Sequence, residues 1–197
     1  MSMKAWSAPR AFALGSVLVL ASCGAPQPAP QEEAPTAQQR AAQSAALADE
    51  FQGELQAALA AAMAEGGPVA AIAVCETSAP AIPEALSVRS GAQITRVAAR
   101  RRNPGAGVPD EVAGLYRELE RAPLAQDGTP RAVHRASDGG FVYLRAIPMQ
   151  EQPCAACHGT AIDPQVAAAI EQAYPDDLAT GFRPGELRGA FLVQWAP

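Results

Sequence analysis

Apolar residues recur at steps of three and four through an alanine-rich stretch from about Thr36 to Glu65. The apolar residues that share one face of this stretch are Leu47, Phe51, Leu55, Leu59, Ala62 and Met63. This spacing, together with many strong helix formers, predicts a long amphipathic helix. Gly66 and Gly67 should end it, and Pro68 suits the first turn of a second helix. We expect the second helix to be short or broken, because the segment from Cys75 to Pro83 contains two prolines.

Alternation of apolar and polar residues marks several segments in the second half of the chain. It predicts strands over residues 93–99, 131–134, 141–147 and 187–195. A turn at residues 138–140 makes the middle two a hairpin. Helices are predicted between the strands, over residues 108–121 and 164–174. A long N-terminal helix followed by helices and strands around an antiparallel meander indicates an α+β domain.

The first 22 residues have the pattern of a secretory signal. Residues 1–10 carry two basic residues and no acidic one, and residues 11–21 are an apolar run too short for a permanent membrane span. The run ends in Leu20-Ala21-Ser22-Cys23, which resembles a bacterial lipobox. We therefore expect a lipoprotein signal peptide over residues 1–22, with Cys23 lipidated and anchoring the mature protein to a membrane. The alternative is an ordinary signal peptide with a free Cys23.

Residues 23–35 are rich in proline, glutamine and alanine, which predicts a flexible tether in front of a domain over residues 36–197. The expected location is the cell envelope, with the domain facing the periplasm. Gly24 stands where an aspartate would often retain a lipoprotein in the inner membrane, so the outer membrane is slightly favoured.

The net charge of the chain limits the classes of partner that we expect it to bind. The formal net charge is −5 at pH 7, and loss of Lys4 and Arg10 with the signal peptide makes it about −7. An acidic mature chain argues against a nucleic acid partner.

The segment Cys154-Ala155-Ala156-Cys157-His158-Gly159 has the pattern that attaches a c-type haem. The thiols of Cys154 and Cys157 would add to the two vinyl groups on one porphyrin edge, with His158 as the proximal iron ligand. A disulfide or half of a zinc site is the alternative for such a cysteine pair. Zinc takes four nitrogen or sulfur ligands, and the sequence has no second CxxC pair and one other histidine, so one covalent haem c per chain is favoured. Export supports this prediction, because c-type haem is attached outside the cytoplasmic membrane.

Four side chains compete for the far side of the iron: Cys75, His134, Met63 and Met149. Methionine is the usual partner of histidine in electron-carrying cytochromes c. However, Met149 is close to the motif in sequence, and Met63 lies on the apolar face of the first helix. His134 falls on a half-exposed predicted strand. Cys75 is either the distal ligand or a buried apolar thiol.

Arg96, Arg100, Arg101 and Arg102 cluster at the end of a predicted strand. The cluster is either a solvated run of charge or a set of partners for the haem propionates, to which a planar guanidinium is suited. Alternate residues of a strand share one side, so Arg100 and Arg102 are the better candidates for binding the haem.

Four landmarks along the chain carry a family resemblance. They are Val74-Cys75 with Ala79-Pro80 and Ile82; Arg102-Asn103-Pro104 with Pro109-Asp110; Tyr143-Leu144 running into Cys154-Ala155-Ala156-Cys157-His158-Gly159; and Ala179-Thr180-Gly181-Phe182 with Gly189-Ala190. In this order they are similar to a single-haem c-type domain family with a PAS-like fold, known in cyanobacteria and proteobacteria as a domain of unknown function. The resemblance covers about residues 43–195. It implies a PAS-like antiparallel sheet with flanking helices, a covalent haem, His158 as proximal ligand and Cys75 as the cysteine opposite it.

Together these predictions describe a membrane-tethered c-type haem protein with a redox role. A Cys75 thiolate would give a lower potential than a His/Met pair and would bind less tightly after reduction. The protein would then act as an electron carrier, or as a redox or ligand sensor that needs a separate redox or signalling protein as partner. We do not expect an enzyme, because haem-based peroxide chemistry would need an open distal site and an acid/base residue that the sequence does not indicate.

Overall fold

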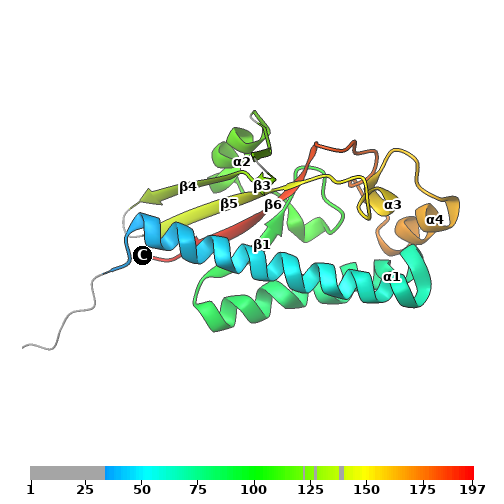
Figure 1. The fold of residues 1–197 in the computed structure, drawn as a ribbon, viewed down its shortest axis with the longest axis horizontal. Helices are drawn as coiled ribbons and strands as arrows, with labels where there is room; N and C mark the ends of the chain where they lie inside the picture. The colour runs from blue at the N-terminus through cyan, green and yellow to red at the C-terminus, as the bar shows by residue number, and fades with distance from the viewer. Residues whose placement is uncertain (1–33, 122, 127, 138–139) are drawn as a thin grey trace, which may run out of the picture. The chain divides into compact units, whose positions relative to one another are not determined.

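The computed structural model describes residues 34–197, except residues 122, 127, 138 and 139 (Figure 1). The predicted signal peptide over residues 1–22, the predicted lipidation site Cys23 and most of the predicted tether lie outside the described residues.

The first element, α1, runs from Ala37 to Ser90 in two arms. A capping box starts it: the Gln39 amide donates to Thr36 Oγ1 (3.2 Å), and the Thr36 amide donates to Gln39 Oε1 (2.8 Å). The arms meet at Gly66 and Gly67, whose backbone is not helical. Gly67 has φ 69°, which favours glycine, and a Cβ on Gly66 would lie 2.8 Å from Ala70 Cβ. The prediction that this glycine pair ends the first helix is therefore right.

The second arm of α1 corrects one prediction, because it is neither short nor broken. It continues to Ser90, with Pro80 and Pro83 inside it. Each proline removes one backbone hydrogen bond and would cost roughly 3 kcal/mol in an isolated helix. Here Pro83 and Leu86 are buried in the core, and such packing supplies most helix stability in proteins.

Four antiparallel strands form the main sheet, in the order β1-β6-β5-β4. They are β1 (Gln93–Val97), β4 (Ala132–Ser137), β5 (Gly140–Pro148) and β6 (Leu187–Trp195). The predicted hairpin is confirmed, since β4 and β5 pair with Ser137 opposite Gly140. The last strand, β6, lies between β1 and β5 in the interior of the sheet. A small second hairpin, β2 (Ala125–Gln126) with β3 (Thr129–Pro130), was not predicted.

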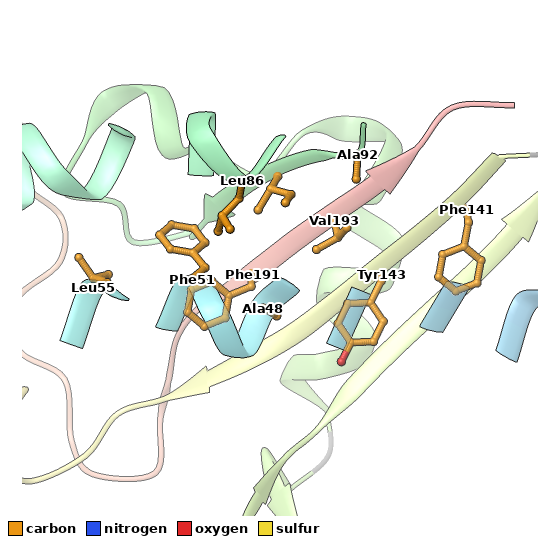
Figure 2. Close-up of a cluster of buried hydrophobic side chains, with 10 residues drawn as sticks. Ala48, Phe51, Leu55, Leu86, Ala92, Phe141, Tyr143, Phe191 and Val193 are labelled. Carbon is orange, nitrogen blue, oxygen red and sulfur yellow. The ribbon is translucent and has the colours of Figure 1, made fainter. Parts of the chain in front are cut away.

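Helices cover both faces of the sheet. Both arms of α1 pack on one face, where Phe51 meets Phe191 with ring centroids 5.0 Å apart (Figure 2). On the other face lies α2 (Ala113–Glu120), through Leu115, Tyr116 and Leu119. The two cores take alternate residues of the same strands: Tyr143 and Val193 face α1, whereas Leu144 and Leu192 face α2. The result is an α+β domain whose antiparallel sheet, flanking helices and long N-terminal helix agree with the predicted PAS-like class.

Between β5 and β6 the chain forms two short helices, α3 (Ala155–His158) and α4 (Pro164–Ala173). The corner where α1 folds back lies beside α4 (Figure 1). Ile72 of α1 packs there with Val166 and Ile170 of α4. This junction between the helical arms and the loops after β5 is where the cysteine motif is found.

Candidate functional site

The motif Cys154–Gly159 folds as a single helical turn. The His158 amide donates to the carbonyl of Cys154 (2.9 Å), and the Gly159 amide donates to the carbonyl of Ala155 (3.0 Å). A Cβ on Gly159 would lie 2.6 Å from that Ala155 oxygen, closer than real Cβ atoms approach. Only glycine therefore lets the chain turn tightly after His158.

One hydrogen bond fixes the state of the His158 ring. Nδ1 lies 2.7 Å from the carbonyl oxygen of Ala179, which is fully buried. A carbonyl can only accept, so Nδ1 carries the proton and Nε2 keeps a free lone pair. Histidine ligands of metals commonly have their second nitrogen held in this way.

A loop from Asp177 to Phe182 holds this arrangement against the motif. The amide of Phe182 donates to the His158 carbonyl, and the amide of Gly181 donates to the Gly159 carbonyl, each at 2.9 Å. Asp177 Oδ1 in turn accepts from the Ala179 amide at 3.1 Å. The carbonyl that orients the imidazole is thus fixed by backbone and side-chain contacts on both sides.

The surroundings of His158 keep its ring neutral. Burial lowers the pKa of His158 well below its usual 6.5, and the positive charges of Arg188 and Arg102 lower it further, against a smaller opposite effect of the Ala179 hydrogen bond. Neutral imidazole is the form that binds a metal ion.

The two motif cysteines are free thiols and are partly buried. Burial raises the pKa of Cys157, Arg102 lowers it, and the nearby thiols of Cys75 and Cys154 raise it. Among the described residues of the domain, no group of three or more His, Cys, Asp or Glu side chains is placed to hold a metal ion.

Cys75 approaches this site from the second arm of α1. Ile72, one helical turn earlier, belongs to the same apolar cluster as Cys157 and Tyr174. The Cys75 thiol also acts on the pKa of both Cys157 and Tyr174, which places it within electrostatic range of them. The structure therefore places Cys75 one helical turn from a residue that packs with Cys157.

The other candidate ligands are placed differently. His134 is exposed on β4 and stacks on Phe141, with ring centroids 5.3 Å apart. Met149 is buried next to the motif, in a cluster with Ala179 and Phe182. Met63 is partly buried on the first arm of α1.

The strand prediction for the arginines is corrected by the structure. β1 ends at Val97, so Arg100 and Arg102 lie in the following loop and share no strand face. Arg100 is exposed, donates to the carbonyls of Leu178 and Thr180, and lies over the Phe182 ring. Arg102 is buried. Its Nε lies 3.1 Å from Asp177 Oδ1, and its Nη2 donates to the Cys157 carbonyl at 2.7 Å.

Sequence reasoning did not find Arg188 or Asp177. Arg188 is buried at the start of β6 and acts on the pKa of His158, yet nothing in the local sequence separates it from an ordinary strand residue. Asp177 follows Tyr174-Pro175-Asp176, which reads as a turn, and only the fold shows that its side chain faces Arg102.

Comparison with known proteins gives two findings. A family model described as Tll0287-like matches residues 27–196. The solved crystal structure of the cyanobacterial haem-protein Tll0287 is 29% identical, covers 61% of this chain and 70% of that chain, and superposes with a TM-score of 0.50. No curated protein matches the chain significantly.

Proposed function

Because the chain belongs to the Tll0287-like family, we propose that it is a c-type haem protein with a redox role in the cell envelope. The similar solved protein is described as a cyanobacterial haem-protein, which supports haem as the cofactor. Under this proposal Cys154 and Cys157 form the thioether bonds, His158 is the proximal ligand, and one haem is bound per chain. The protein would not be an enzyme but an electron carrier or a redox sensor.

The observation that carries the proposal is the state of the motif. His158 presents a neutral ring with Nδ1 held by the Ala179 carbonyl and Nε2 unprotonated. Cys154 and Cys157 are free thiols on the same helical turn. These are the groups that covalent haem attachment needs, in the chemical states that it needs them. Haem c, once bound, would supply a one-electron iron couple.

Cys75 is the proposed distal ligand. It lies on an arm of α1 that contacts α4, one helical turn after Ile72, which packs with Cys157. Cysteine would bind as thiolate, which favours the oxidised state and gives a potential below that of a His/Met cytochrome. Loss of this ligand on reduction would let Cys75 report the redox state to a partner protein. The same ligand pair would also serve simple electron transfer.

The location is part of the proposal. The signal over residues 1–22 and the lipobox ending at Cys23 support a lipid-anchored protein whose domain faces the periplasm. A Cys23→Ser variant should be released from the membrane fraction into the soluble envelope fraction. Equal membrane retention of that variant and wild type would contradict lipid anchoring at Cys23.

Haem attachment is tested by exporting the full chain in a host that has cytochrome c maturation machinery. Haem that stays with the polypeptide on a denaturing gel shows covalent attachment. Wild type and Cys75→Ser should both retain haem, whereas the double variant Cys154→Ala/Cys157→Ala should lose it. Cys75→Ser is the matched control, since it also removes a thiol near the motif. Absence of covalent haem in wild type would refute the proposal.

Spectra of the same samples test the distal ligand. Oxidised wild type should show low-spin haem with thiolate features that are absent from Cys75→Ser. Identical spectra would show that Cys75 only packs in the core. A His/Met spectrum in both samples would turn attention to Met149, which lies in the cluster beside the motif.

A further inference from the structure

A cluster of guanidinium groups lies near His158. Arg96, Arg102 and Arg188 all act to lower the pKa of His158. One carboxylate, Asp177, pairs with this cluster among the described residues, and it binds Arg102 through Nε (3.1 Å) and Nη2 (3.3 Å). Arg102 and Asp177 thus form a neutral pair, which leaves two positive charges near the site.

Arg188 is buried without a matching anion. Its side chain is 6% exposed, its Nη1 donates to the Arg100 carbonyl at 3.3 Å, and its Nε is buried with no hydrogen-bond partner in the described part of the chain. Arg96 is partly buried and forms no salt bridge with any described residue. Burial lowers the pKa of both arginines, and for Arg188 the charge of Arg96 is the next cause.

The sheet brings the backbones of Arg96 and Arg188 close to each other. Arg96 directly precedes Val97 on β1, and Arg188 directly precedes Gly189 on β6. Gly189 has φ 159°, and a Cβ there would lie 2.7 Å from the Val97 carbonyl oxygen, so the two strands meet closely at this point. Glycine at position 189 therefore permits the close approach of β1 and β6 beside Arg96 and Arg188.

A contact with that loop confirms the position of Arg188. The Arg188 guanidinium lies 5.5 Å from the centroid of the Phe182 ring. Phe182 in turn donates its amide to the His158 carbonyl at 2.9 Å. A single residue, Phe182, therefore connects Arg188 with the proposed proximal ligand, His158.

Two charged groups that repel each other in a buried site are costly unless an anion joins them. A guanidinium fork is suited to carboxylates, and haem carries two propionate carboxylates. The number of free positive charges at the site equals the number of those carboxylates. On this basis we infer that Arg96 and Arg188 bind the haem propionates. This inference rests on the proposed function, and it replaces the pair Arg100 and Arg102 that the strand pattern favoured.

Arg100 is a poor candidate by comparison. Its guanidinium already donates to the carbonyls of Leu178 and Thr180 and lies 3.8 Å from the Phe182 ring centroid. It also has Glu186 as a partner, at 3.8 Å. Arg102 has its own carboxylate in Asp177.

The test compares haem-loaded wild type with Arg96→Gln, Arg188→Gln and Arg188→Lys. Arg183→Gln is the matched control. Arg183 is exposed and lies five residues before Arg188, and the substitution removes the same positive charge. The first measurement is the propionate bending band in the resonance Raman spectrum of the oxidised protein. The second is the midpoint potential at one pH. Neither depends on any activity of the protein.

Both glutamine variants should shift the propionate band. Each should also lower the midpoint potential, because a positive charge near the haem favours the reduced state. We expect the reduction equilibrium to change about tenfold, which is ~59 mV for a one-electron couple. Arg188→Lys should shift the band with a smaller change in potential, since it keeps the charge but not the planar fork. Arg183→Gln should match wild type.

The outcomes separate the inference from the proposed function. Covalent haem with propionate bands that do not differ from those of Arg183→Gln would overturn the inference and leave the proposed function standing. Wild type without covalent haem would overturn the proposed function, and the inference with it. If Arg188→Gln does not fold, the propionate bending band of Arg96→Gln and Arg188→Lys tests the inference instead.

Discussion

Replacement of Asp177 by alanine should loosen the loop that orients His158. The Asp177 carboxylate accepts from Arg102 Nε at 3.1 Å, from Arg102 Nη2 at 3.3 Å and from the Ala179 amide at 3.1 Å. Both side chains of the pair are nearly inaccessible, with 5% exposed for Arg102 and 7% for Asp177. Removing one partner of a buried ion pair leaves the other charge without compensation, which costs about 3–5 kcal/mol.

The loss should be measured by urea unfolding of the exported protein. Small domains have a free energy of unfolding of about 5–15 kcal/mol, so a loss of this size should appear as a clearly lower midpoint at unchanged slope. Asp176→Ala is the control, because its neighbouring carboxylate is exposed and should change stability by no more than about 0.5 kcal/mol. If the two variants unfold at the same urea concentration, the Arg102–Asp177 pair does not hold this loop. The visible spectrum should change in Asp177→Ala alone, because the Ala179 carbonyl would no longer be fixed.

Three further predictions concern other parts of the domain. Gly159→Ala places a Cβ 2.6 Å from the Ala155 oxygen, so it should destabilise the protein by about 1–3 kcal/mol and lower the yield of covalent haem; normal yield and stability would contradict the tight turn. Phe51→Ala should cost about 3–5 kcal/mol in urea unfolding, because Phe51 is fully buried against Phe191, whereas Val88→Ala at an exposed site of the same helix should cost little. The haem-free variant Cys154→Ala/Cys157→Ala should lose stability as the pH falls below about 6.5, since the pKa of His158 is lowered on folding and the unfolded chain binds the extra proton. That dependence should weaken when His158→Gln is added, and an unchanged profile would show that His158 is not its source.

Local periodicity was enough to predict much of this fold. The first arm of α1, the hairpin of β4 and β5, α4 and the last strand all follow from steps of three and four or from alternation. The glycine corner was also correct, since Gly67 has a backbone conformation that favours glycine. These features depend on residues that are neighbours in the sequence.

The errors lie where distant residues decide the structure. Pro80 and Pro83 led to the prediction of a short or broken second helix, but packing on the sheet stabilises the second arm of α1. Arg100 and Arg102 were predicted to share one side of a strand. The strand ends before them, and Arg102 forms a salt bridge with Asp177. The role of the Ala179 carbonyl could not be predicted either, because any backbone can supply that group and only the fold brings it to Nδ1.

The two prolines inside the second arm of α1 have a consequence for its dynamics. Pro80 and Pro83 have no amide hydrogen, so the carbonyls of Glu76 and Ala79 lose their usual helical donors. These carbonyls lie just after Cys75, in a stretch of exposed and half-buried residues between the buried residues Ile72 and Pro83. Amides there should exchange with deuterium through local opening, at a lower free energy than those of the first arm. Movement of Cys75 would then be set by a local opening rate, while the sheet and the His158 loop stay folded.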